Sequence, residues 1–298
     1  MECYKKMNNK KIVLFSHDAG GAQVMSSYFH FFEKKLLYIC CNHKTEGFFK
    51  EKNIKYKKMK FNDAIKYGDI FYTSTSWNSD LEKRAIKELL KKNKKIISFI
   101  DGWTNYKERF ILNKKYYFPN EIWAFDKYAY KKCLKVFPKY IKIKLKKNYF
   151  YKFAKTKILN YKAKKNFKNK CTFFTEPLSK TYKKIYDNKP EYSELEAFEF
   201  FLNNIKKIED IKLIDVKIHP NDTKYKYIKI IKKNSNLKIK IINHNIFKIL
   251  AESYYLASCS SSVMYVGEKN NNSLICTIPK KKILSPLPIK NMKFLRDL

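Results

Sequence analysis

Residues 211–222 read IKLIDVKIHPND, and the rest of the chain is organised around this stretch. Its first six residues form a short apolar run, broken by two charged side chains, that predicts a β-strand. His219-Pro220 follows, and the proline stiffens the turn because its ring fixes φ. In open α/β sheets, ligands bind outside the carboxyl ends of the strands, so we expect the His219 imidazole at a ligand-binding edge. A loop histidine without chemistry fits the same residues, so a function for His219 depends on partners elsewhere.

Apolar runs of strand length alternate with helical stretches along the whole chain. Strands are predicted at residues 11–16, 36–41, 69–75, 95–100, 121–125, 171–175, 211–218, 237–242, 254–258 and 273–278. Helices are predicted at residues 24–32, 45–51, 80–92, 127–135, 192–206 and 246–253, from Val263, and at 289–298. Continuous apolar runs such as KIVLFS are typical of parallel strands buried on both faces. The βα rhythm therefore predicts an α/β protein whose parallel sheets are covered by helices.

The rhythm runs twice, with an interruption that predicts two domains. A chain of 298 residues fits two domains of about 150 residues each. We expect an N-terminal Rossmann-like domain at 1–140, a connector rich in Lys and Tyr at 141–170, and a C-terminal Rossmann-like domain at 171–298. Residues 141–145 alternate like an edge strand. Two such βαβ domains facing across a central cleft describe the GT-B architecture, with ligands bound in the cleft.

The formal net charge is +38, from 65 Lys and Arg against 27 Asp and Glu. Such an excess fits nucleic acid, an anionic membrane surface or a phosphate-bearing substrate. A compositional origin fits as well, because lysine is spread along the chain with abundant Asn and Ile while Arg is scarce. Dedicated nucleic-acid binders concentrate their charge and favour Arg. No specific nucleic-acid partner is therefore expected, whereas peripheral contact with an anionic membrane is.

The seven cysteines form an odd set without a CxxC pair. They predict buried, reduced thiols in a cytoplasmic protein and spell out no zinc site. No run of 18 apolar residues and no apolar signal region occur, so no membrane span is expected. The predicted location is cytoplasmic, peripheral on the inner face of the cytoplasmic membrane.

Residues 16–22, SHDAGGA, follow the first predicted strand. Two glycines allow a ligand to approach the backbone closely, and the N-terminus of the next helix favours anions or sugar hydroxyls. His17, Asp18, Gly20 and Gly21 are therefore candidates for binding a sugar acceptor. The pattern is not GxGxxG, so a nicotinamide cofactor is not supported. A tight turn that needs glycine explains the same residues.

Residues 99–110, FIDGWTNYKERF, follow the fourth predicted strand. Asp101 comes directly after the strand, and burial against the neighbouring indole of Trp103 would raise its pKa toward the range of a general base. Trp103, Asn105 and Arg109 add groups for binding an acceptor. A helix-capping Asp with a core Trp would give the same pattern.

Ser260-Ser261-Ser262 precede the helix expected from Val263. Hydroxyls and free N–H groups at a helix start suit a phosphate, although serines are also ordinary caps. Glu176, at the end of strand 171–175, is assigned to the same donor site.

Asp101-Gly102, His219-Pro220 and the three serines, in this order, resemble the motifs of the bacterial GT-B sialyltransferases. The resemblance implies that Asp101 is the general base on the acceptor hydroxyl. It implies that His219-Pro220 contact the phosphate of a CMP-sugar donor and aid its departure, and that the serines bind that phosphate. Transfer would invert the configuration at the anomeric carbon of the sugar and would need neither a metal nor a further cofactor. The family's first acid is replaced here by Ile100, so one carboxylate must serve alone.

The predicted function is therefore transfer of an acidic sugar, such as sialic acid, another nonulosonate or Kdo, from a CMP-activated donor. The acceptor would be a cell-surface glycan or a lipid-linked glycan. A CDP-polyol phosphotransferase of teichoic-acid type also carries His-Pro and paired serines, and there the His would be the base. A basic binding protein without catalysis would account for the charge, and a nucleotide-sugar epimerase would account for the architecture.

Overall fold

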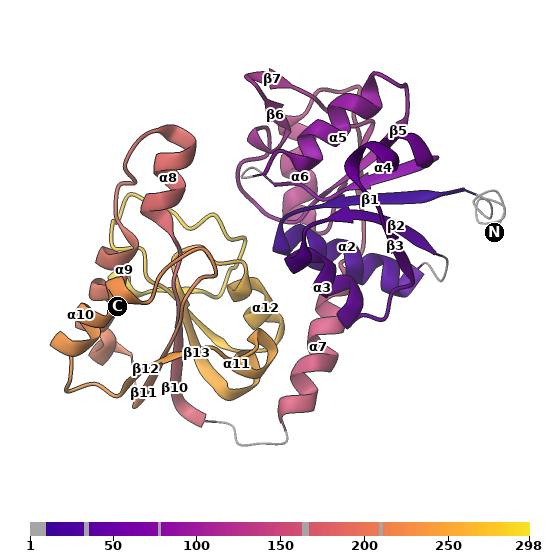
Figure 1. The fold of residues 1–298 in the computed structure, drawn as a ribbon. Coiled ribbons are helices and arrows are strands. Elements are labelled where there is room, and N and C mark those ends of the chain that lie inside the picture. The colour runs from indigo at the N-terminus through magenta and orange to yellow at the C-terminus, as the bar shows by residue number, and fades with distance from the viewer. Residues whose placement is uncertain (1–9, 33–35, 77–78, 163–166, 209–210) are drawn as a thin grey trace. The chain divides into compact units, whose positions relative to one another are not determined.

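The computed structural model describes residues 10–32, 36–76, 79–162, 167–208 and 211–298. The chain divides into two compact units, Met1–Lys152 and Phe153–Leu298 (Figure 1). Each unit is built on a parallel sheet with helices on both faces. Helix α7 (Tyr149–Lys162) spans the division, and with strand β9 (Lys142–Leu145) it makes up most of the predicted connector. Connector residues 163–166 lie outside the described residues.

Among the described residues of the first unit, a parallel sheet of seven strands has the order β3-β2-β1-β4-β5-β8-β9. Its chain order reverses between β1 and β4, which is the topological switch point where such sheets bind ligands. The remaining strands are β1 (Ile12–Ser16), β2 (Leu37–Cys41), β3 (Tyr56–Lys58), β4 (Ile70–Thr73), β5 (Lys95–Ile100) and β8 (Glu121–Ala124). The helices are α2 (Ala19–Phe32), α3 (His43–Glu51), α4 (Phe61–Tyr67), α5 (Leu81–Leu90) and α6 (Lys127–Val136).

Both faces of this sheet are buried, which explains the unbroken apolar runs. Val13 and Phe15 of β1 join a core completed by α4, α5 and α6. Their neighbours Ile12 and Leu14 point to the opposite face, where α2 and α3 complete a second core (Figure 1). Strand alternation therefore sends the apolar residues of β1 into two separate layers.

The second unit repeats this design. Among its described residues, six parallel strands have the order β12-β11-β10-β13-β14-β15, so the switch point lies between β10 and β13. The strands are β10 (Phe167–Phe174), β11 (Leu213–Lys217), β12 (Ile239–Ile242), β13 (Ser253–Ser258), β14 (Ser273–Cys276) and β15 (Lys293–Phe294). The helices are α8 (Leu178–Tyr186), α9 (Glu194–Asn203), α10 (Tyr225–Lys233), α11 (Ile246–Glu252) and α12 (Val263–Lys269). Helices α9 and α10 cover one face, and Figure 1 shows α11 and α12 on the other.

The helix predicted at 289–298 was wrong. Residues 293–294 form β15, which pairs in parallel with β14, and a 3-10 turn follows at Leu295–Asp297. The edge of β14 offers unpaired backbone groups, and Leu295 is fully buried. Pairing and burial together therefore outweigh the helical pattern of ten residues.

The structure contains elements that the sequence pattern did not indicate. Helices α4, α7, α8 and α10 and strand β3 were missed, and so was a hairpin of β6 (Ile111–Leu112) and β7 (Lys115–Tyr116). Helix α2 begins at Ala19 rather than at residue 24, so Gly20 and Gly21 belong to its first turn. The six cysteines in the described residues are free, and all but the partly buried Cys41 are buried; Cys3 lies outside these residues.

Candidate functional site

Asp101 is the first residue after β5, at the carboxyl edge of the first sheet. Its carboxylate is 12% exposed and lies 2.7 Å from the guanidinium of Arg109, itself 7% exposed. The same guanidinium nitrogen donates to the carbonyl (3.2 Å) and the hydroxyl (3.0 Å) of Thr75, two residues beyond β4. Arg109 thus ties the ends of β4 and β5 together and fixes the orientation of the carboxylate.

Two glycines make room for this ion pair. A Cβ at Gly20 would lie 2.5 Å from Oδ2 of Asp101, and a Cβ at Gly102 would lie 2.8 Å from the Arg109 guanidinium. Gly20 has no positive φ, so close approach rather than a turn requires it. The Asp-Gly pair after β5 is therefore a carboxylate followed by the space that its arginine needs.

The environment of Asp101 favours its protonated form. Burial raises the pKa of Asp101, the nearby negative charge of Asp18 raises it further, and Arg109 opposes both effects. Asp18 lies directly before α2, where its Oδ1 accepts from the Gly20 N–H at 3.0 Å. A carboxylate with a raised pKa and a partly exposed edge is suited to accept a proton from a bound hydroxyl group.

The switch point of the first sheet holds a second buried carboxylate that the sequence did not indicate. Glu82 of α5 accepts hydrogen bonds from the His17 N–H (2.7 Å) and from the hydroxyls of Ser74 (2.9 Å) and Ser79 (3.2 Å). Burial raises its pKa. The hydroxyls of Ser74 and Ser16 are hydrogen-bonded at 3.0 Å, with Ser16 as the donor because Ser74 gives its one proton to Glu82. The polar run Thr73-Ser74-Thr75-Ser76 was the available signal for this edge.

The remaining predicted acceptor residues lie around this edge with different partners. His17 is exposed, and its carbonyl accepts from Asn42 at 2.9 Å. A Cβ at Gly21 would lie 2.5 Å from the Cβ of Ser74, so Gly21 packs the helix against the end of β4. The indole of Trp103 donates to Asp126 at 2.9 Å, and Asn105 has φ of 55°. Trp103 thus anchors this loop to the start of α6, and the ion pair with Arg109 orients Asp101.

His219 lies two residues beyond β11 in the second unit. Its N–H donates to the hydroxyl of Thr175 (2.8 Å), and its Nδ1 accepts from the Asn221 N–H (3.1 Å). With Nδ1 as acceptor, the neutral ring carries its proton on Nε2. Nε2 is then the atom able to donate to a phosphate oxygen. Pro220 is exposed in the same turn.

Glu176 occupies the switch point of the second sheet. Its Oε1 accepts from the hydroxyl of Ser258 (2.6 Å) and from the N–H groups of Cys259 (2.9 Å) and Ser260 (2.8 Å), and Oε2 accepts from the Ser260 hydroxyl. The N–H and hydroxyl of Ser260 were expected to bind a phosphate, but the carboxylate of Glu176 already accepts hydrogen bonds from both.

The other two serines of the motif differ from Ser260. The Ser261 N–H donates to Ser258 at 3.1 Å, and Ser262 is exposed at the start of α12. Within the part of the chain that the structure describes, neither the Ser261 nor the Ser262 hydroxyl forms a hydrogen bond with another protein group. These two hydroxyls therefore remain able to meet a ligand.

Neither a family model nor a curated protein matches the chain. Solved structures do. MnaA of S. aureus, solved with UDP, is 12% identical with a TM-score of 0.58, covering 90% of this chain and 78% of its own. HepE of Anabaena, solved with UDP and glucose, is 9% identical with a TM-score of 0.58 and coverages of 90% and 80%. A candidate UDP-N-acetylglucosamine 2-epimerase of Listeria monocytogenes is 12% identical with a TM-score of 0.57 and coverages of 90% and 79%.

The likeness is one of fold. It confirms the predicted α/β class of GT-B type with two Rossmann-like domains. In the described residues, no group of three or more His, Cys, Asp or Glu side chains is arranged to hold a metal ion. No helix among them is long and apolar enough to cross a membrane.

Proposed function

We propose that the chain is an inverting glycosyltransferase that uses a nucleotide-activated sugar, with Asp101 as general base. The observation that carries the proposal is the Asp101 carboxylate, which burial and Asp18 make more basic while Arg109 holds it in place. Asp101 removes the proton of the acceptor hydroxyl as that oxygen attacks the anomeric carbon. The bond from this carbon to the donor phosphate breaks, and the nucleotide leaves with the electron pair.

The second unit supplies groups suited to the leaving phosphate. His219 donates from Nε2 to a phosphate oxygen, and the hydroxyls of Ser261 and Ser262 add two further donors. Glu176 fixes the backbone of the loop that carries these hydroxyls. We propose that Glu176 shapes the donor site and leaves phosphate binding to the groups beyond it.

The donor that we propose is a CMP-activated acidic sugar, and the acceptor a membrane-linked glycan met at the cytoplasmic face. The Asp-Gly, His-Pro and Ser-Ser-Ser order supports the CMP-sugar. The chain has 65 basic side chains against 27 acidic ones, and this excess of positive charge suits an anionic donor and an anionic membrane. The relatives by fold support a nucleotide-sugar more broadly, since two of them were solved with UDP.

An epimerase acting on a UDP-sugar is the second candidate. It is favoured by a relative by fold that is a candidate UDP-N-acetylglucosamine 2-epimerase. The two candidates differ in products, because an epimerase returns an intact nucleotide-sugar whereas a transferase releases the free nucleotide.

A thermal-shift panel of CMP, CDP, UDP and GDP tests the donor. A nucleotide at 100 times its dissociation constant stabilises the folded protein by about 2.7 kcal/mol. We expect CMP to give the largest shift and CMP-sialic acid or CMP-Kdo to be turned over to CMP. If the chain neither binds nor turns over any CMP-sugar, the CMP-sugar proposal is contradicted. UDP binding with an interconverted UDP-sugar favours the epimerase.

A further inference from the structure

We propose that the first unit docks on anionic phospholipid bilayers through an aromatic pocket rimmed by lysines, at the end of α6 and beside the β6–β7 hairpin. The pocket has a volume of about 340 Å³. Its lining residues come from these two places in the fold and are Lys107, Tyr116, Phe118, Val136, Phe137 and Pro138. Five of these six are apolar or aromatic, so the floor of the pocket is largely apolar.

The aromatic rings form a continuous path from solvent into the core. Tyr116 is 52% exposed and stacks on Phe118 with ring centroids 5.4 Å apart. Phe118 meets the buried ring of Phe137 edge to face at 5.7 Å. Tyr140, two residues beyond the pocket, is 77% exposed. Exposed tyrosines around an apolar depression are suited to the boundary between lipid headgroups and acyl chains.

Lysines lie in or next to the lining segments in the sequence, with almost no acidic side chains among them. Five exposed lysines lie in or within two residues of the lining positions, namely Lys107, Lys114, Lys115, Lys135 and Lys139. Within the described residues, none of the five forms an ion pair with a carboxylate. Segments 107–118 and 131–140 contain Glu108 as their one acidic residue. Charge complementarity therefore selects an anionic surface as the occupant.

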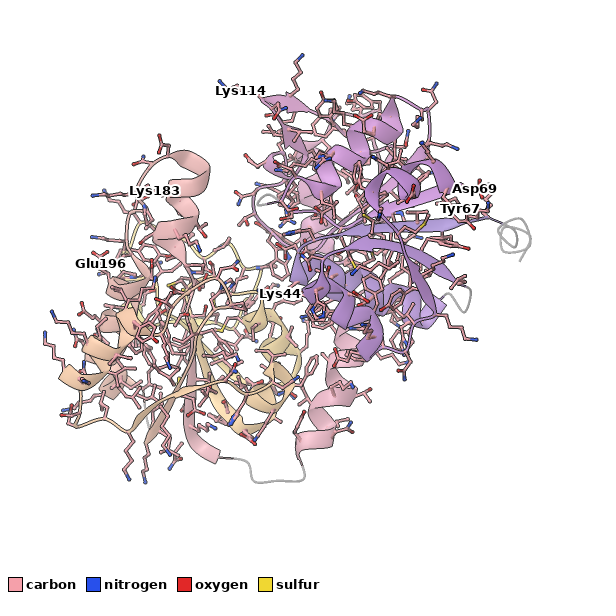
Figure 2. The ribbon with its side chains drawn as sticks, in the orientation of Figure 1. Lys44, Tyr67, Asp69, Lys114, Lys183 and Glu196 are labelled. Atoms are coloured by element: carbon pink, nitrogen blue, oxygen red, sulfur yellow. The ribbon has the colours of Figure 1, made fainter. Side chains whose placement is uncertain are left out.

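The hairpin turn presents its lysines in a fixed way. Asn113 and Lys114 link β6 to β7 with φ of 50° and 63°, the geometry of a type I′ turn. Lysine is an unusual residue at positive φ, because its side chain gains nothing there from the backbone. Figure 2 shows Lys114 at the outer end of this hairpin. The turn thus holds cationic groups beside the aromatic path, where both could meet one bilayer surface.

Vesicle flotation tests the surface without any donor nucleotide, so its result is independent of the proposed transferase activity. The full chain is mixed with vesicles of equal parts phosphatidylglycerol and phosphatidylcholine, and with pure phosphatidylcholine. The variant carries Lys114→Glu, Lys115→Glu and Tyr116→Ser. The matched control carries Lys232→Glu, Lys233→Glu and Tyr225→Ser on α10, with the same charge change and an exposed tyrosine. Thermal unfolding checks that both variants fold.

We expect the wild-type chain to bind the anionic vesicles and the pocket variant to bind at least about 25-fold more weakly, since each lysine near such a surface contributes about fivefold. The control should lose much less. In high salt, where charge is screened, Tyr116→Ser alone should still weaken binding and Tyr225→Ser should not. Equal losses in variant and control would assign binding to overall charge and overturn the proposal. Absence of vesicle binding would overturn it too, as would a dimer in sedimentation that the pocket variant abolishes.

Discussion

The guanidinium of Arg109 lies 2.7 Å from the carboxylate of Asp101, and both side chains are largely shielded from water. The two residues are only eight apart, yet they meet through tertiary structure, because Arg109 also binds the end of β4 through Thr75. A base held in this way keeps one orientation while its pKa stays above the ordinary range of an aspartate. Substitutions can test this arrangement, and they can also test the role of His219 in the second unit.

Replacing Arg109 with Met should lower the free energy of unfolding by about 3–5 kcal/mol, because it leaves a buried carboxylate unpaired. The loss should be larger at pH 8 than at pH 5. Below its raised folded pKa, Asp101 is protonated and neutral, whereas above that pKa the unpaired charge opposes folding. Urea unfolding at the two pH values measures this. In Asp101→Asn the same arginine substitution should cost much less, and equal costs in both backgrounds would show that the pair is not coupled.

Asp101→Asn should reduce kcat/KM by about 10²–10⁴-fold, because the amide cannot accept the proton of the acceptor. Release of CMP in the presence of acceptor measures the reaction. Asp69→Asn is the matched control, since Asp69 is also next to a glycine but is exposed, and its carboxylate accepts a hydrogen bond from the Lys11 N–H (Figure 2). Near-full transfer by Asp101→Asn would favour the phosphotransferase-type mechanism with His219 as base.

The acidic limb of the pH profile should report Asp101. Asp18→Asn removes a negative charge and keeps the oxygen that accepts from the Gly20 N–H. The pKa of Asp101 should therefore fall, and the limb of kcat/KM should move to lower pH. A profile that Asp18→Asn leaves in place would mean that another group titrates in the reaction.

Gly20→Ala should cut activity by about 10²-fold, because the added Cβ would lie 2.5 Å from the Asp101 carboxylate and displace it. Stability should also fall, because displacing this carboxylate disturbs its buried ion pair with Arg109, although alanine itself is favoured within a helix. Gly47→Ala in α3 is the control, where a Cβ meets nothing within 4 Å. That variant should gain about 0.5–1 kcal/mol in thermal unfolding and keep full activity. Loss of activity in both variants would show a general effect of rigidifying helices.

In the second unit, His219→Asn should weaken CMP binding by about 1.5–3 kcal/mol in calorimetry. The asparagine oxygen can replace Nδ1 as acceptor from the Asn221 N–H, so the turn survives while the donor at Nε2 is lost. His244→Asn, at an exposed position beyond β12, should leave affinity unchanged. Undiminished CMP binding by His219→Asn would remove this residue from the donor site.

The sequence alone was sufficient for the α/β class and for most strands. Strands β1, β5 and β11 are apolar runs whose alternate residues face opposite sides of their sheets, and such runs occur in few other settings. Helices α4 and α10 were not indicated. They are short, rich in polar residues and helical mainly because the sheet offers an apolar face for Ile65 or Ile230. The local sequence pattern is a weak predictor of a helix whose stability comes mainly from tertiary packing.

The candidate site was only partly within reach of the sequence. A carboxylate after β5 and an imidazole after β11 lie at the carboxyl edges of their sheets, as the strand pattern predicted. What these groups touch depended on chain topology. Parallel order brings Thr75 to Arg109, 34 positions away in the sequence, and brings Glu176 to Ser258 and Ser260 at the end of β13, 82 and 84 positions away.

The sequence thus determined which chemical groups end each strand, because strand length and apolar alternation are local properties. The contacts of Arg109 with Asp101 and of Glu176 with the Ser260 loop arise from the folded arrangement of the strands. Both outcomes depend on which strands become neighbours. The strand order, in turn, depends on burying the apolar side chains on both faces of each sheet. The stretch IKLIDVKIHPND placed His219 at an edge of the sheet. In the folded chain, the Asn221 N–H donates to Nδ1 of this ring and so favours the tautomer with the proton on Nε2.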